Sequence, residues 1–196
     1  MKKWIVPLIL VVVLLFWGFN VNNSAVDYNE TVKKQWGNVE TSYQRRNDLI
    51  GNLVNTVKGA ADFERGTLTD VIEARSKATQ TNIDAANITP EQLQQYSEAQ
   101  SGLSSALSRL LVTVERYPEL KANQNFLKLQ DELASTENTI QTARTRFNEA
   151  VESYNQYVNK MPRKLVASMI GFDEKPYFSS EAGAEKPVDV EFDFGS

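Results

Sequence analysis

Apolar residues recur at alternating intervals of three and four along most of this chain, which is the spacing of an amphipathic α-helix. The first long helical segment is expected at residues 24–61, after a polar break at 20–23, and its apolar stripe has an arginine at the centre. The stripe consists of Val32, Trp36, Val39, Tyr43, Arg46, Ile50, Leu53, Val57 and Ala60. A guanidinium in this place needs an explanation, because charged groups are costly to bury without partners.

Three further helices are expected after a turn marked by Gly59 and Gly66, since glycine is unfavourable inside a helix. The third helix starts at a capping box, with Thr89 as N-cap, Pro90 as first helical residue and Gln92 closing the box. The expected ranges are 67–79, 90–117 and 120–162. No long stretch alternates with a period of two, so the pattern predicts an all-α helical bundle with almost no sheet.

The N-terminal residues form an uncharged apolar run that follows Lys2 and Lys3. As a helix the run, residues 4–21, would span roughly 27 Å, which is close to the thickness of a hydrocarbon core. Trp4 and Trp17 lie near its two ends, where aromatic side chains favour the membrane interface. We therefore expect a single-pass transmembrane helix at 4–21, preceded by a cytoplasmic stub at 1–3. A cleaved signal peptide is the alternative, but no small-x-small cleavage site follows the run.

The charges that flank this span favour an N-terminus in the cytoplasm. The amino terminus, Lys2 and Lys3 are positive on one side, whereas Asp27 and Glu30 are the first charges on the other. Positively charged flanks tend to stay on the cytoplasmic side of a membrane. The expected location is therefore the cell (inner) membrane, with the main domain on the extracytoplasmic side.

The composition excludes several kinds of site. The 196 residues carry a net charge of -4 and no clustered basic face, so nucleic acid is not an expected partner. The chain has no Cys and no His, which rules out disulfides, thiolate or imidazole metal sites, and nucleophiles activated by His. Glycine-rich nucleotide-binding loops and EF-hand loops are also absent. An oxygen-only Mg²⁺ or Ca²⁺ site remains an alternative, but we expect no catalytic residue, metal or cofactor.

Arg46 has three interpretations. Its methylenes could lie on the apolar stripe with the guanidinium at the edge, it could pair with an acidic side chain of another helix, or it could bind a partner. Asp48 is a poor intramolecular partner, because residues two apart point to different faces of a helix. Glu137 on the fourth helix is a better candidate, and so are Glu64 and Glu73.

From residue 173 onwards the composition becomes acidic, with several Pro and Gly residues, which predicts a disordered tail at 173–196. The tail nevertheless contains Phe178, Val190, Phe192 and Phe194. In an extended VEFDF segment the last three would lie on one side, an arrangement that suits strand addition to the sheet edge of a partner. A tail without contacts and a tail folded back onto the helices are the alternatives.

Residues 28–78, YNETVKKQWGNVETSYQRRNDLIGNLVNTVKGAADFERGTLTDVIEARSKA, resemble the signature of the LemA family of bacterial membrane-anchored helical proteins. The segment FNEAVESYNQYVNKMP at 147–162 and the overall plan of the chain are similar as well. The resemblance implies an antiparallel four-helix bundle at 24–172 and supplies no catalytic residue. Many relatives have proline where this chain has Gly51, so a proline kink at this position is not implied here.

Three hypotheses about function follow. The leading hypothesis is a non-enzymatic, membrane-tethered scaffold that organises an unknown membrane or envelope protein. Its candidate structural or interaction residues are Trp36, Arg46, Glu137, Phe192 and Phe194. The alternatives are a lipid-organising protein that self-associates into homo-oligomers at the bilayer, and a carboxylate-based ligand-binding or enzymatic bundle. Di-iron bundles use Glu-x-x-His pairs, which a chain without His cannot supply.

Overall fold

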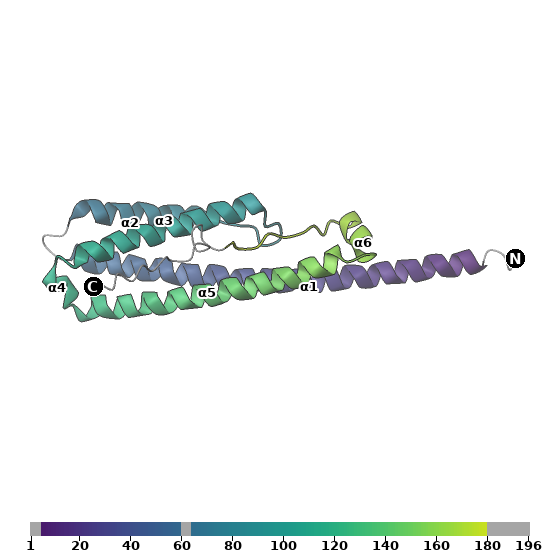
Figure 1. Ribbon diagram of the computed structural model, residues 1–196, viewed down its shortest axis with the longest axis horizontal. Coiled ribbons are helices and arrows are strands. Elements are labelled where there is room, and N and C mark those ends of the chain that lie inside the picture. The colour runs from purple at the N-terminus through teal and green to yellow at the C-terminus, as the bar shows by residue number, and fades with distance from the viewer. Residues whose placement is uncertain (1–4, 60–63, 180–196) are drawn as a thin grey trace, which may run out of the picture.

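The computed structural model describes residues 5–59 and 64–179. Helices are the only regular elements in these residues, so the prediction of an all-α fold is confirmed. Figure 1 shows the long helices α1, α2, α3 and α5 side by side, with the N-terminal part of α1 projecting alone beyond the others. The helices are α1 (Ile5–Lys58), α2 (Arg65–Gln80), α3 (Pro90–Val114), α4 (Pro118–Lys121), α5 (Gln124–Asn159) and α6 (Arg163–Met169).

Helix α1 is continuous over 54 residues, so the expected break at 20–23 is wrong. Asparagine lowers helix stability by less than about 1 kcal/mol per residue, and a helix that is already formed propagates through such positions without a new nucleus. The side-chain amide of Asn20 also donates to the carbonyl of Phe16 at 2.9 Å. The apolar N-terminal segment and the helical body therefore share one helix.

The apolar residues of α1 change from exposed to buried near Val21. The side chain of Phe19 is 68% exposed, whereas Val21 is 2% exposed. The stripe predicted from Val32 to Val57 is buried along its whole length, Arg46 included. Among the described residues, α1 holds the one segment that is long and apolar enough to cross a membrane.

The four long helices pack mainly as two pairs. Helix α1 packs along α5, and α2 packs along α3. The colour order in Figure 1 shows that successive long helices run in opposite directions. One core cluster surrounds Trp36 between α1, α3 and α5, and a second surrounds Leu53 nearer the α4 end.

The ends of α3 and α5 show which capping signals the sequence carries. At the start of α3, Gln92 N donates to Thr89 Oγ1 at 3.2 Å and Thr89 N donates to Gln92 Oε1 at 3.1 Å, which confirms the predicted capping box. Helix α5 begins later than expected, because the short helix α4 occupies Pro118–Lys121. Asn123 then caps α5 by accepting from the backbone of Phe126.

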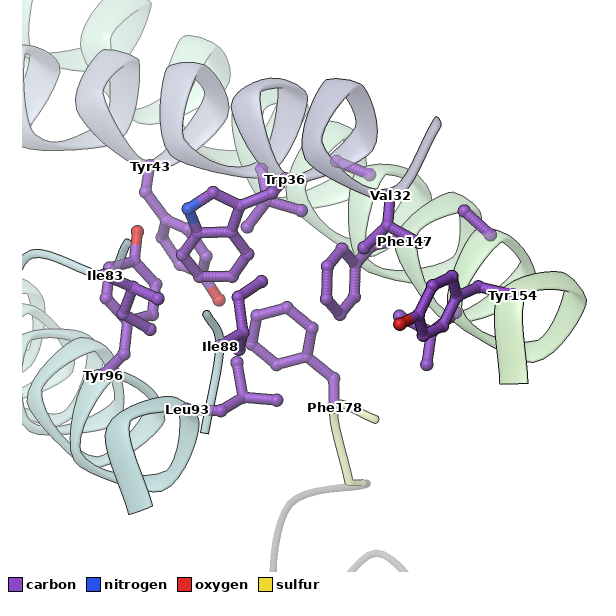
Figure 2. Close-up of a cluster of buried hydrophobic side chains, with 14 of the residues drawn as sticks. Val32, Trp36, Tyr43, Ile83, Ile88, Leu93, Tyr96, Phe147, Tyr154 and Phe178 are labelled. Atoms are coloured by element: carbon purple, nitrogen blue, oxygen red, sulfur yellow. The ribbon is translucent and has the colours of Figure 1, made fainter. Parts of the chain in front are cut away.

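Residues 172–179, which we call the C-terminal strap, lie against the helices. The ring of Phe178 stacks on Trp36 with centroids 5.9 Å apart, and it meets Phe147 edge-on at 5.4 Å (Figure 2). Phe178 is 5% exposed and belongs to the core around Trp36. The prediction that a disordered tail begins at residue 173 is therefore wrong for 173–179. The remainder, with Phe192 and Phe194, lies outside the described residues.

Two asparagines of α5 explain why the polar strap is ordered. Asn148 donates to the carbonyl of Phe178 at 3.0 Å and accepts from its N–H at 2.9 Å. Asn155 makes the same pair of bonds with Lys175, at 2.8 and 2.9 Å. Each amide thus satisfies both backbone groups of one strap residue, as a neighbouring strand would. The strap also brings its own apolar anchor, Phe178.

We predict that Phe178→Ala lowers the free energy of unfolding by about 3–5 kcal/mol, because it empties a fully enclosed aromatic site in the core. Thermal unfolding of the full chain in detergent, followed by circular dichroism, measures this. Tyr177→Ala is the matched control, since the neighbouring Tyr177 is 44% exposed. Equal melting temperatures for the two variants would show that the strap does not contribute to the fold.

Candidate functional site

Arg46 is buried at the centre of the helical body, and the residue is 4% exposed. Its Nη2 donates to Gln100 Oε1 at 2.6 Å and to the Gln100 carbonyl at 3.3 Å. Its Nη1 donates to Ser104 Oγ at 3.1 Å and contacts Glu137 Oε2 at 3.3 Å. The side chain also passes over the ring of Tyr43, at 4.8 Å from its centroid.

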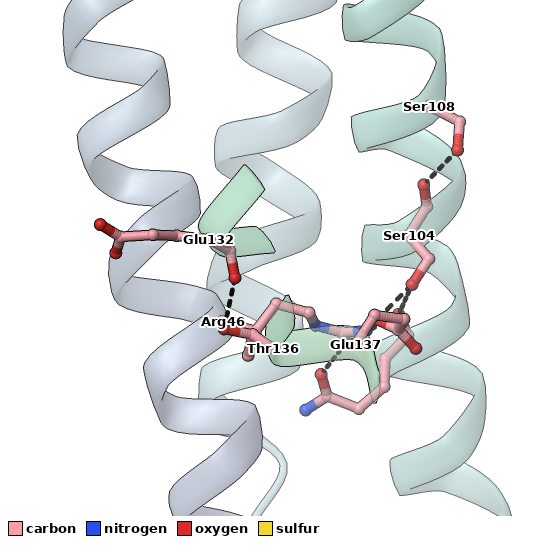
Figure 3. Close-up of polar contacts among 7 residues, drawn as sticks. Arg46, Ser104, Ser108, Glu132, Thr136 and Glu137 are labelled. Atoms are coloured by element: carbon pink, nitrogen blue, oxygen red, sulfur yellow. Dashed lines mark hydrogen bonds and ion pairs between the residues drawn. The ribbon is translucent and has the colours of Figure 1, made fainter. Parts of the chain in front are cut away.

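These contacts join all four long helices. Arg46 extends from α1 to α3 through Gln100 and Ser104, and to α5 through Glu137 (Figure 3). Gln100 in turn donates from Nε2 to the carbonyl of Ala78, near the end of α2, at 3.3 Å. One charged and one neutral side chain therefore link the two helix pairs. The bond to the buried amide oxygen is the shortest of the set, and charged donors make the stronger hydrogen bonds.

The sequence suggested Arg46 and Glu137 as a pair, and the structure brings them together. The side chain of Glu137 is 51% exposed, however, so solvent screens its attraction to Arg46. The other two acidic candidates lie elsewhere: Glu64 is 4.0 Å from Arg116, at the α4 end of the body, and Glu73 is exposed. The main buried partner is the neutral Gln100, which a search for acidic residues does not find.

A cleft of about 550 Å³ opens beside this network, between α3 and α5. Arg46 and Tyr43 contribute to its lining from α1, beneath the gap between the two helices. The α3 side carries polar residues such as Gln94, Ser101 and Ser104, and the α5 side carries Glu137 and Arg144. The helical body is thus open on this side, where α3 and α5 do not close against each other.

The C-terminal strap forms one end of the cleft. Pro176, Tyr177 and Ser179 all contribute to its lining. Arg144 holds this end in place: its Nη2 donates to the carbonyl of Ser179 at 2.9 Å, and its guanidinium lies 5.0 Å from the centroid of the Phe178 ring. Tyr177 remains 44% exposed at the rim. The cleft is therefore built from segments that are far apart in the sequence.

The chemical groups in the cleft suit binding. Its hydroxyl-bearing residues are serines and the two tyrosines Tyr43 and Tyr177. Ser104 Oγ both accepts from Arg46 and donates to the Gln100 carbonyl at 3.2 Å. No residue of the cleft is a histidine or cysteine, since the chain has neither. Among the described residues, no group of three or more Asp or Glu side chains is arranged to hold a metal ion. Positive and negative side chains instead face a shared, solvent-accessible space.

Trp36, the remaining described residue among the candidates, lies apart from the cleft, inside the core. It is fully buried, with the rings of Tyr96 and Phe147 edge-on at 5.3 and 5.5 Å. Figure 2 shows it enclosed by aromatic and aliphatic side chains from helices, the 81–89 loop and the strap. Its place in the structure is that of a core residue.

Comparison with known proteins places the chain in a family. The model of the LemA family matches residues 35–192. The chain belongs to the LemA family. The match extends through α2, α3, α5 and the strap, and so includes every segment that lines the cleft.

Three relatives show how far the similarity extends. Magnetosome protein MamQ 2 of Paramagnetospirillum magneticum is 26% identical over 187 residues, covering 85% of this chain and 67% of the relative. Magnetosome protein MamQ of Magnetospirillum gryphiswaldense is 25% identical with the same coverage. Protein LemA of Metamycoplasma hominis is 25% identical over 153 residues, covering 78% of this chain and 65% of the relative. This LemA-family chain therefore spans about two thirds of the length of these relatives.

Two titratable groups outside the cleft hold the strap. Burial, and then the neighbouring Asp173, raise the pKa of Tyr154 to about 12, so its hydroxyl stays protonated and donates to the Asp173 carbonyl at 2.9 Å. Burial, and then Lys33, lower the pKa of Lys175, whose Nζ donates to the Ala86 carbonyl at 3.0 Å. Both groups connect the strap to other parts of the LemA-family body.

We predict that Arg46→Ala lowers the free energy of unfolding by about 2–4 kcal/mol, because Gln100 loses the donor to its buried amide oxygen and a cavity is left. Glu137→Gln should cost under about 1 kcal/mol, since the carboxylate is half exposed. Thermal and denaturant unfolding of the full chain in detergent measure both changes.

A double-mutant cycle tests which partner matters more. Arg46→Met combined with Gln100→Leu should recover more of the lost stability than Arg46→Met combined with Glu137→Leu, because it replaces the buried polar pair with apolar groups of similar volume. A larger coupling between Arg46 and Glu137 would contradict this assignment.

Proposed function

We propose that this LemA-family chain is a membrane-tethered, non-enzymatic scaffold or adaptor that holds a partner protein in the cleft between α3 and α5. The observation that carries the proposal is the continuity of α1. One helix begins as an exposed apolar rod and continues, without interruption, as a central helix of the body that forms the cleft.

The exposed part of α1 supports the membrane tether. From Leu8 to Phe16 every side chain is apolar, and more than half of its surface is accessible. Exposure of so many apolar side chains is unfavourable in water, and it is typical of a helix that is surrounded by lipid. The body begins directly after this segment, so the scaffold would stand on the membrane without a flexible linker.

The cleft supports the docking of a protein segment. It lies between two antiparallel helices, is lined by side chains of both charges, and includes the exposed aromatic Tyr177. Protein interfaces favour this combination of an aromatic anchor, arginine and a polar rim. A partner segment with polar and charged side chains matches these groups.

The side chains that line the cleft favour a non-enzymatic function. The serine hydroxyls of the cleft have no histidine beside them that would act as a base. Two relatives of this chain carry the name magnetosome protein MamQ, which states no reaction. Both facts support an organising role.

Photo-crosslinking in living cells tests the docking proposal. A benzoylphenylalanine at Gln94, which lines the cleft, should crosslink to a discrete partner protein. The same residue at Gln95 should not, because that exposed neighbour on α3 points about 100° away from the cleft. Equal crosslinking at both positions, or none at Gln94, would contradict a binding cleft.

Two further variants make the crosslinking result specific. Ser101→Arg places a bulky side chain in the cleft and should abolish the Gln94 crosslink without changing the melting temperature, because Ser101 is exposed. Removal of residues 183–196, which include Phe192 and Phe194, separates the cleft from the tail as docking elements. Loss of the crosslinked partner in this deletion alone would assign docking to the tail.

The orientation of the tether can be tested separately. The amino terminus, Lys2 and Lys3 favour an N-terminus in the cytoplasm and a body outside it. A reporter enzyme that is active only outside the cytoplasm, fused after Ser196, should therefore be active. Activity of a cytoplasm-specific reporter at the same position would show that the body lies inside.

A further inference from the structure

Helix α6 presents an apolar face to solvent. Met161, Leu165 and Met169 are 67%, 60% and 86% exposed, and Ile170 beside them is 44% exposed. Leu165 and Met169 are four residues apart in the helix, so they lie along one side of it, and Met161 lies in the turn that precedes α6. Ala167, on the opposite side, is buried in the core around Trp36. The inner face of α6 thus holds it to the body, while its outer face covers nothing in the described residues.

Basic side chains border this apolar face. Lys160 and Lys164 are exposed and stand one position before Met161 and Leu165. Arg163 lies over the ring of Tyr157, with its guanidinium carbon 4.4 Å from the centroid. Apolar residues flanked by lysine and arginine are the pattern of a helix that lies in the surface of a membrane.

Helix α6 lies beside the exposed apolar segment of α1. The helix packs on both α1 and α5, at the end of the body where α1 projects alone (Figure 1). Tyr157, which stacks under Arg163, directs its hydroxyl to the carbonyl of Val21 at 3.4 Å. Val21 follows Phe19, the last exposed apolar residue of the N-terminal segment, by about 3 Å along the helix axis.

We infer that α6 is a second membrane contact: Met161, Leu165 and Met169 enter the interface of the bilayer that α1 crosses, and Lys160 and Lys164 contact anionic lipid headgroups. The inference rests on the proposed membrane tether. A headgroup region is roughly 5–8 Å thick on each side, and an interfacial helix sinks about 5–10 Å into the boundary with the acyl chains. Val21, which is connected to α6 through Tyr157, lies only about 3 Å beyond Phe19 along the axis of α1. This distance is smaller than the depth of the interface, so α6 can reach it.

A lipid surface explains the patch better than a protein would. The exposed residues of α6 and the exposed apolar run of α1 lie on neighbouring elements at one end of the molecule, so one apolar medium can cover both. The lysines add the charge complementarity that anionic lipids provide. With two separate contacts, the membrane would also fix the tilt of the body.

Site-specific fluorescence on the full chain tests this inference. Because the chain has no cysteine, Met169→Cys gives a single attachment point for an environment-sensitive fluorophore. The labelled protein is reconstituted into vesicles of phosphatidylcholine and phosphatidylglycerol, with and without brominated acyl chains. We expect a blue-shifted emission at position 169 that brominated lipid quenches.

Two other single-cysteine positions serve as references. Leu14→Cys, within the exposed run of α1, reports insertion of the tether. Val112, 70% exposed on α3 near the α4 end of the body, is a well-exposed apolar position away from the α6 end, so a label at Val112→Cys should not be quenched. Quenching at 14 without quenching at 169 would overturn the inference while leaving the tether intact. Lack of quenching at 14 would refute the tether itself, and the inference with it.

Charge and alternative partners are tested with the same label. Lys160→Gln with Lys164→Gln should reduce quenching at position 169, and the loss should be greater in anionic than in purely phosphatidylcholine vesicles. Lys121→Gln with Lys128→Gln, the same charge change near the opposite end of the body, should have no effect. A blue-shifted emission at 169 that persists in detergent and increases with protein concentration would show instead that a second copy covers the patch.

Discussion

The helical body depends on the constraint that a buried guanidinium must find oxygen acceptors. Arg46 lies on the core-facing side of α1, where it is removed from water, and desolvation without hydrogen bonds would cost more than the body could tolerate. Its acceptors come from α3 and α5, and Gln100 extends the connection to α2. Apolar stripes alone allow helices to slide by a turn, because one turn of leucines resembles the next. A donor and acceptors at fixed positions do not allow such a shift, because sliding would break their hydrogen bonds. Arg46 therefore sets the register of the helices.

The same network helps to explain why the body is open on one side. Polar side chains around Arg46 keep α3 and α5 from closing over an apolar core at this level, and the cleft is the result. Farther along, the gap between the helix pairs is filled by the C-terminal strap, where Phe178 completes the aromatic cluster around Trp36. The strap therefore links the helix pairs in the half of the body that contains Trp36, and Arg46 and Gln100 link them in the middle. Both connect helix pairs that otherwise touch mainly within themselves.

The sequence was sufficient for the features that depend on local pattern. The stripe from Val32 to Val57, the capping box at Thr89 and the need of Arg46 for partners all follow from residue spacing. The sequence was insufficient for the features that depend on tertiary contacts. Gln100 carries no charge and so gave no signal as the partner of Arg46. The strap looked disordered because its order comes from Asn148 and Asn155, whose amides replace a neighbouring strand only after α5 has formed. The cleft, assembled from α1, α3, α5 and the strap, has no local signature at all.

The continuity of α1 links the membrane end of the molecule to the cleft by a fixed distance. Arg46 follows Val21 by 25 positions in the same helix, which corresponds to about 38 Å along its axis. If α1 crosses the bilayer as proposed, a segment bound in the cleft would be held roughly that far from the membrane surface. A small membrane protein with short loops could not reach it. The partner would have to be a protein with a domain or an extended segment of its own outside the bilayer. Contact of α6 with the membrane would make this spacing more exact, since a body fixed at two points cannot lean towards the surface.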